Sequence, residues 1–162
     1  MVTVGGARAA GAEQRLKDLG VSLPPPPSPL GAYVEAVKVG NLLNLSGMLP
    51  VIGHEPQFVG RVGSDLSIQS GYEAARLACL CGLAVAKAHI GTLDKVTGVA
   101  RLCVYIATAG DFRDHAKVAD GASELLLKVF GPEMLSPRMV LGVVNLPLGL
   151  PVAVELAFQV AA

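Results

Sequence analysis

The chain has 162 residues, 52% of them hydrophobic and 16% charged, which allows one domain that is more apolar than most domains of this size. Its 13 basic and 13 acidic residues give a net charge of zero, and it has no Trp, three Tyr and four Phe. Proteins that bind nucleic acid usually carry a basic surface and aromatic side chains on which bases stack, so nucleic acid is not expected as a partner. No run reaches the roughly 18 apolar residues of a membrane-spanning helix, so the apolar excess predicts burial between subunits and no membrane partner.

The chain is expected to begin with a flexible segment over residues 1–11 and a short helix over residues 13–19 (EQRLKDL), which ends at Gly20. The first segment lacks the long apolar core of a secretory signal, which favours a cytoplasmic location.

Prolines then dominate the chain, at Pro24 to Pro27 and at Pro29, and they exclude both a helix and a central strand. We expect a stiff connector that lies across the domain surface; a proline-rich ligand for a partner domain is the alternative. Residues 1–29 are therefore predicted to be an N-terminal extension, and residues 30–162 the domain itself.

Two short strands, Tyr33–Val39 and Leu42–Ser46, are predicted around a hairpin turn at Gly40-Asn41. Residues 50–69 are predicted to be a long loop. Ser70 and Glu73 have the spacing of a capping box and predict a helix over residues 71–89.

The second half of the chain alternates again between strand and helix patterns. A long β-rich run at 96–107 predicts a central strand, 111–130 an amphipathic helix, and 139–144 with 152–160 a final strand pair. This order predicts an α+β two-layer sandwich: a mixed β-sheet with two helices on one face. The edges of so small a sheet are expected to pair with neighbouring subunits.

The cysteines and glycines give no sign of a metal or a cofactor. Cys79 and Cys81 lie two apart on a predicted helix and cannot chelate one ion; with Cys103 they are expected to pack as small apolar thiols. The run Gly60-Arg-Val-Gly63 is too short to cradle a phosphate, and no nucleotide-binding motif occurs.

Arg138 and Glu155 are the candidate catalytic residues. Arg138 stands at the start of an apolar strand, where a guanidinium can bind a carboxylate through two hydrogen bonds; the alternative is a surface arginine that flanks a strand. Glu155 lies among apolar residues, which suits acid–base chemistry; the alternatives are an ion pair with Arg138 or Arg101, or a solvent-facing side chain.

Tyr33, Ser46 and Gly47 are the candidate binding residues, at the ends of the first hairpin. Tyr33 can cover a pocket, and Ser46 with nearby backbone N–H groups can hold a carbonyl or carboxylate oxygen; a packed ring and a strand-ending turn are the alternatives. No histidine lies near enough in sequence to activate the serine as a nucleophile.

Six short stretches resemble the Rid proteins (reactive intermediate deaminase, or YjgF, superfamily), and the resemblance covers residues 30–160. The opening resembles the family's G-P-Y-x-x-x-V-x-x-G-N and S-G-Q-x-P motifs, and the tail its R-x-x-x-x-V-x-x-L-P and V-E-V-E hairpin. The matching stretches are residues 31–34 (GAYV), 39–41 (VGN), 45–50 (LSGMLP), 91–96 (GTLDKV), 138–147 (RMVLGVVNLP) and 152–155 (VAVE). The extended N-terminus and the long loop resemble the longer, chorismate-mutase-like branch.

The resemblance implies a homotrimer with three clefts between subunits, where 2-imino or enamino acids are hydrolysed to 2-keto acids and ammonia. It implies that Arg138 binds the substrate carboxylate and that Tyr33, Ser46 and Gly47 line the cleft. The family's water-activating glutamate falls at Ala153, so Glu155, two residues on, is at most a substitute.

Other functions remain open at this point. Ala153, and Met48 in place of the family's glutamine, favour a non-catalytic trimer that binds a small carboxylate metabolite. An endoribonuclease is disfavoured by the neutral charge, and a chorismate mutase by the lack of several cations around Arg138.

Overall fold

The computed structural model describes residues 10–162. The expectation of a flexible start over residues 1–11 falls almost entirely on residues 1–9, which lie outside the described residues.

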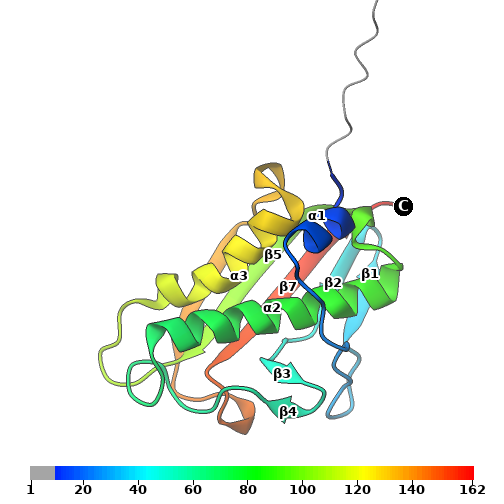
Figure 1. The fold of residues 1–162 in the computed structure, drawn as a ribbon. Coiled ribbons are helices and arrows are strands. Elements are labelled where there is room, and N and C mark those ends of the chain that lie inside the picture. The colour runs from blue at the N-terminus through cyan, green and yellow to red at the C-terminus, as the bar shows by residue number, and fades with distance from the viewer. Residues whose placement is uncertain (1–9) are drawn as a thin grey trace, which may run out of the picture.

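Five strands form one mixed sheet in the order β1-β2-β7-β5-β6 (Figure 1). β7 lies in the middle and pairs antiparallel with β2 and β5, whereas β6 runs parallel to β5 at the edge. A parallel pair needs a long crossover, which helix α3 supplies. The bounds are Ala36–Val39 (β1), Leu42–Leu45 (β2), Val96–Ala107 (β5), Arg138–Val143 (β6) and Val152–Val160 (β7).

Helices α2 (Ile68–Ile90) and α3 (His115–Phe130) cover one face of the sheet, and α1 (Ala12–Asp18) packs against α3 (Figure 1). The apolar side chains of the strands alternate toward these helices, and the largest buried ones include Leu43, Leu102, Leu156 and Phe158. The predicted α+β two-layer sandwich is confirmed, with α1 as a third helix.

The two long helices approach each other closely at Gly121 of α3. A side chain there would meet the carbonyl oxygen of Tyr72 in α2, and it would also lie 3.2 Å from the backbone nitrogen of Arg76. Glycine therefore allows the two helix backbones to pack almost in contact.

The sequence predicted one long loop over residues 50–69, and this prediction is wrong in part. They include a small hairpin of β3 (Val51–Ile52) and β4 (Glu55–Pro56), which turns at Gly53 with a φ of 63°. Two-residue strands are too short to show a periodic pattern, and that is why the sequence did not indicate them.

Helix α2 begins three residues earlier than predicted, because Ser67 is its N-cap and the predicted capping box is wrong. The Ser67 Oγ accepts a hydrogen bond from the backbone N–H of Ser70 at 3.0 Å. The Glu73 carboxylate instead accepts a hydrogen bond from Gln69 at 3.1 Å, one turn inside the helix.

We expect Ser67→Ala to lower the free energy of unfolding by about 1 kcal/mol, because the first turn of α2 loses its side-chain cap. Ser70→Ala is the matched control and should cost less than half as much, since it removes the hydroxyl that lies 3.0 Å from Ser67 Oγ but keeps the backbone N–H that the cap uses. Urea unfolding of both variants measures the difference, and equal losses would contradict this assignment.

The N-terminal segment is tied to the domain through Glu13. Its carboxylate contacts Lys87 Nζ at 2.8 Å and accepts the backbone N–H of Leu93 at 3.0 Å. Burial alone would raise the pKa of Glu13, but the hydrogen bonds from Lys87 and Leu93 outweigh it and lower the pKa. From α1 the chain crosses α2 and reaches the proline-rich stretch (Figure 1).

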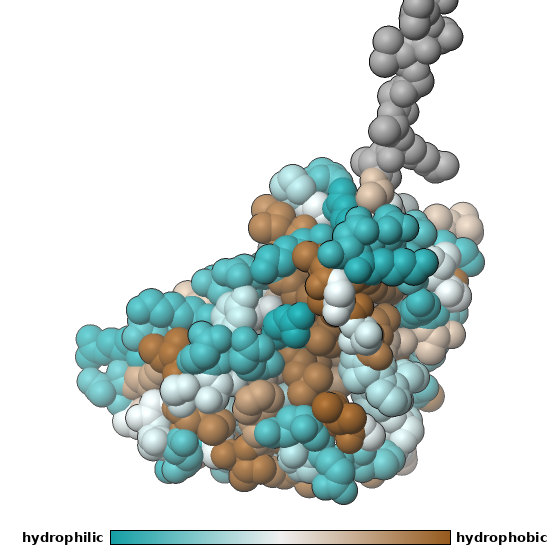
Figure 2. Space-filling view, in the orientation of Figure 1, coloured by the Kyte–Doolittle hydropathy of each residue, from teal (hydrophilic) through white to brown (hydrophobic). Residues whose placement is uncertain are grey.

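The two faces of the molecule differ in character. Hydrophilic side chains cover α1 and much of α3 on the helix-bearing side (Figure 2). On the opposite, open face of the sheet, the register places large apolar side chains that are about 40–60% exposed, on both the β1–β2 side and the β6 side. These open-face residues are Val37, Val39, Leu42, Met139 and Leu141.

No helix within residues 10–162 has the length and apolarity to cross a membrane.

Candidate functional site

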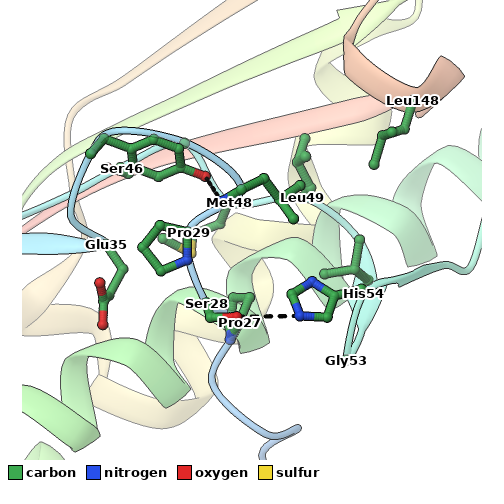
Figure 3. A pocket seen from close by; sticks show the side chains of 14 residues that line it. Pro27, Ser28, Pro29, Glu35, Ser46, Met48, Leu49, Gly53, His54 and Leu148 are labelled. Carbon is green, nitrogen blue, oxygen red and sulfur yellow. Dashed lines mark hydrogen bonds between the residues drawn. The ribbon is translucent and has the colours of Figure 1, made fainter.

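A cleft with an empty volume of about 490 Å³, its open mouth included, lies where β1 begins and β2 ends (Figure 3). The sequence predicted three of its lining residues, Tyr33, Ser46 and Gly47, and the structure brings all three together. The remaining walls come from the proline-rich stretch, from the residues after β2, from the β3–β4 hairpin and from the loop before β7. They are Pro27, Ser28, Pro29, Leu30, Glu35, Met48, Leu49, Val51, Gly53, His54 and Leu148.

Hydrogen bonds hold the predicted binding residues in place. The Ser46 hydroxyl donates to the carbonyl of Val34 at 2.6 Å, and the Tyr33 hydroxyl accepts the backbone N–H of Leu30 at 3.1 Å. Tyr33 thereby fixes the end of the proline-rich stretch against the cleft. No heavy atom lies within 4 Å of where a Cβ of Gly47 would be, so space remains beside that backbone.

Arg138 is the first residue of edge strand β6, and its register opposite Leu102 turns it toward the helices. Its Nη1 donates to Asp120 Oδ1 at 2.7 Å and to Ser123 Oγ at 3.1 Å, both on α3. Within residues 10–162 both hydrogen bonds use Nη1, so the Nε–H and Nη2–H pair stays available. That pair is one of the two edges through which a guanidinium binds a carboxylate.

Arg138 does not line the cleft of its own chain. β6 is three strands away from β2 in the sheet, roughly 14 Å at the usual spacing between strands. The carboxylate-binding candidate and the cleft therefore lie on opposite sides of one subunit.

Glu155 points to the open face of the sheet, away from the side on which Arg138 meets α3. Its Oε1 accepts a hydrogen bond from Arg101 Nε at 2.9 Å, and its Oε2 accepts one from the Tyr105 hydroxyl at 2.9 Å. Ala153 lies beside this group, opposite Tyr105 in the register. Of the alternatives for Glu155, the structure has the ion pair with Arg101, and it does not bring Glu155 and Arg138 together within one chain.

The Cys103 thiol and the hydrogen bond to Glu155 raise the pKa of Tyr105 to about 12. Because the folded state holds this proton more tightly than the unfolded chain, the contribution to stability is complete below pH 10 and is lost between pH 10 and 12. We therefore expect Tyr105→Phe to flatten the decline of the unfolding free energy over that interval, measured by urea unfolding. An unchanged slope would contradict the assignment.

Tyr72 is the natural comparison for that measurement. Its hydrogen bond to Glu124 raises its pKa to about 12 as well, so Tyr72→Phe should flatten the same interval while Glu155 keeps its partners. The double variant should then show the sum of the two changes, since the two tyrosines share no partner.

Ser28 and His54 are cleft residues that sequence reasoning missed. The Ser28 Oγ lies 3.3 Å from His54 Nε2, although the two residues are 26 apart in sequence (Figure 3). No sequence signal joined them, because the contact depends on the path of the proline-rich stretch across α2. Arg101 and Tyr105 could have been found, since strand alternation places them on the face that carries Glu155.

The thiols behave as the sequence predicted. All three cysteines are free and buried, and burial raises the pKa of Cys79 and of Cys81. In the part of the chain that the structure describes, no group of three or more His, Cys, Asp or Glu side chains could hold a metal ion.

Comparison with known proteins assigns this architecture to a family. The sequence model of the family described as "YjgF/chorismate mutase-like, putative endoribonuclease" matches residues 13–159. The chain is also 36% identical over 156 residues to "Protein TCP17" of Trypanosoma cruzi, covering 96% of both chains. The chain belongs to the YjgF/chorismate-mutase-like family.

Solved structures agree with this membership. The crystal structure of a "putative endoribonuclease" of Shewanella oneidensis superposes on this chain with a TM-score of 0.89 and 32% sequence identity, covering 93% of this chain and 100% of that one. The Agrobacterium tumefaciens protein Atu1372, described as having unknown function, superposes with a TM-score of 0.84 and 32% identity. The match covers 93% of this chain and 92% of that one. RidA of a Psychrobacter species superposes with a TM-score of 0.59 and 21% identity, covering 83% of this chain and 93% of that one, which shows a shared fold.

The resemblance to the Rid (YjgF) superfamily and to its longer branch is thus confirmed.

Proposed function

We propose that this YjgF-family chain is a cytoplasmic hydrolase of small 2-imino or enamino acids, working as a homotrimer whose clefts lie between subunits. The products are a 2-keto acid and ammonia, and the substrate is recognised by its carboxylate. No cofactor or metal takes part in this proposal.

The observation that carries the proposal is the way Arg138 is held. Asp120 and Ser123 fix its guanidinium through Nη1 alone, which orients the Nε and Nη2 donors together. A guanidinium fixed in this way loses little further freedom when a carboxylate binds, and it stays charged in any surroundings.

A second copy of the chain would complete the site. The cleft with Tyr33 and Ser46 lies beside β1 and β2, whereas Arg138 lies on β6 at the other edge of the sheet. A head-to-tail contact that joins unlike edges closes into a ring when its rotation allows, and three copies make the smallest such ring beyond a dimer. The exposed apolar side chains of the open face, on the sides of both edges, support burial in such a ring.

The chemistry asks little of the protein beyond positioning. Water adds to the carbon of the C=N bond, and the resulting carbinolamine expels ammonia as the C=O bond forms. The imine carbon is already electrophilic, so a fixed carboxylate and an ordered water can supply much of the rate. Glu155 is the candidate to take the proton from water, provided that it leaves Arg101 or Tyr105.

A non-catalytic trimer that binds a small carboxylate metabolite is the second candidate. The observation that favours it is the environment of Glu155, both of whose oxygens accept hydrogen bonds, beside Ala153 at the position of the family's glutamate. A water molecule would have to compete with Arg101 and Tyr105 for these two oxygens before Glu155 could take its proton. A ribonuclease activity, which the descriptions of related proteins mention, is less well supported for this chain, because a net charge of zero gives little attraction for RNA.

The test is an assay of purified protein for release of 2-keto acid from freshly generated 2-imino acids, beside Arg138→Ala. Turnover above the uncatalysed rate that disappears in the variant supports the hydrolase. Folded wild-type protein that shows no turnover, but is stabilised against heat by 2-keto acids, supports the binding protein instead.

A further inference from the structure

Leu148 has an unusual backbone conformation. It lies in the 3₁₀ turn Pro147–Gly149 with a φ of 60° and a ψ of 14°, and among residues 10–162 it is the one residue other than glycine with a positive φ. A leucine in this left-handed region is strained, because its Cβ crowds the following carbonyl oxygen. Asparagine or glycine would adopt the same conformation at lower cost.

The strained backbone holds the leucine in an exposed position. Leu148 is 54% exposed and lines the cleft, on the wall that comes from the loop before β7 (Figure 3). Neither the core nor the sheet benefits from a large apolar side chain there. Strained residues of this kind concentrate where a protein binds a ligand.

The cleft around Leu148 is mostly apolar. Pro29, Met48 and Leu49 are among the apolar residues that line the rest of the cleft. The thioether chain of Met48 adapts its shape to an apolar partner. A ligand with a polar side chain would lose hydrogen bonds to water on entering this part of the cleft.

We infer that Leu148 determines specificity: it makes the cleft select carboxylates whose side chain is bulky and apolar. In this arrangement the carboxylate meets Arg138 of a neighbouring copy, and a branched or aromatic side chain packs against Leu148, Met48 and Leu49. The inference rests on the proposed function and deepens it, because it names the class of 2-imino and 2-keto acids that the site accepts.

The experiment titrates the protein with stable 2-keto acids in a calorimeter. 4-Methyl-2-oxopentanoate and phenylpyruvate are the apolar probes, 2-oxoglutarate is the polar one and pyruvate is the small one. Wild-type protein should bind both apolar probes at least about tenfold more tightly than pyruvate, as expected when several carbon atoms enter an apolar pocket. It should bind 2-oxoglutarate no more tightly than pyruvate.

The decisive variant is Leu148→Asn, which keeps the approximate size of the side chain and suits a positive φ. The preference for 4-methyl-2-oxopentanoate over pyruvate should fall about tenfold in this variant. Leu19→Asn is the matched control; Leu19 is 43% exposed at the end of α1 and is not among the cleft residues, so the preference should be retained. Size-exclusion chromatography checks that both variants assemble as the wild type does.

The outcomes separate this inference from the proposed function. If Arg138→Ala abolishes binding of every keto acid but the wild type shows no preference for apolar side chains, the inference is overturned and the proposed function stands. If Leu148→Asn keeps the full wild-type preference, Leu148 is not the determinant. If no keto acid binds the wild type, both fail. The wild-type preference needs no variant, so it can be decided even if Leu148→Asn misfolds.

Discussion

The substitution Gly121→Ala is expected to lower the free energy of unfolding by about 2 to 3 kcal/mol, the range of a poorly tolerated overpacking change. The new Cβ would meet the carbonyl oxygen of Tyr72 in α2, a backbone atom that moves only if the whole helix moves. Helix propensity alone predicts the opposite sign, a gain of about 1 kcal/mol for alanine over glycine. The sign of the change, measured by urea unfolding, therefore decides whether the helix contact dominates.

Gly82→Ala is the matched comparison, because Gly82 is also a glycine inside a buried helix. A Cβ there would lie 2.7 Å from Cδ1 of the buried Leu156, the end of a side chain that can shift more readily than a helix backbone. We expect a loss of less than about 1 kcal/mol, since the gain in helix propensity partly offsets the contact. Equal losses at the two positions would show that the backbone of α2 adapts as readily as a side chain.

Removing the guanidinium of Arg138 is expected to have the largest effect on function. Arg138→Ala should lower kcat/KM for 2-imino acids at least about 100-fold, because two charge-assisted hydrogen bonds are worth about 1.5–3 kcal/mol each. Arg138→Lys keeps the charge but offers no pair of parallel donors, so we expect about a tenfold loss or more. Steady-state kinetics of keto-acid release measures the series.

Arg113→Ala provides the control for the loss of a positive charge. Its side chain is 86% exposed and it pairs only loosely with Asp111, at 3.8 Å, away from both halves of the proposed site. Its kcat/KM should stay within about twofold of the wild type, because exposed charges far from a ligand are screened by salt. Wild-type kinetics in Arg138→Ala would refute the carboxylate-binding role.

Long periodic segments were predictable from the sequence, and short ones were not. The central strand at 96–107 has the predicted bounds, because β-branched residues stand near both of its ends, at Val96, Thr97 and Val99 and again at Val104 and Ile106. Helix α3 begins at His115, four residues later than expected, because amphipathic spacing does not say where the first turn closes. The β3–β4 hairpin and the cap at Ser67 depend on single contacts that no periodicity reveals.

The candidate site was predictable as residues but not as an arrangement. Tyr33, Ser46 and Gly47 belong to motifs that are continuous in sequence, and they meet in one cleft. Arg138 and Glu155 are 17 positions apart near the end of the chain, yet strand alternation turns them to opposite faces. Ser28, His54 and Leu148 reach the cleft from three separate loops, and loop paths cannot be read from residue spacing.

The central position of β7 has a consequence for the order of synthesis. A ribosome makes the β1–β2 hairpin and β5 well before residues 152–160, but the hairpin joins β5 only through β7, which lies between β2 and β5. The nascent chain therefore carries an incomplete sheet, with two separate groups of strands, until residues 152–160 have left the exit tunnel. Aggregation during translation is the hazard of that interval, and the early hairpin, with short strands and exposed Lys38, limits it.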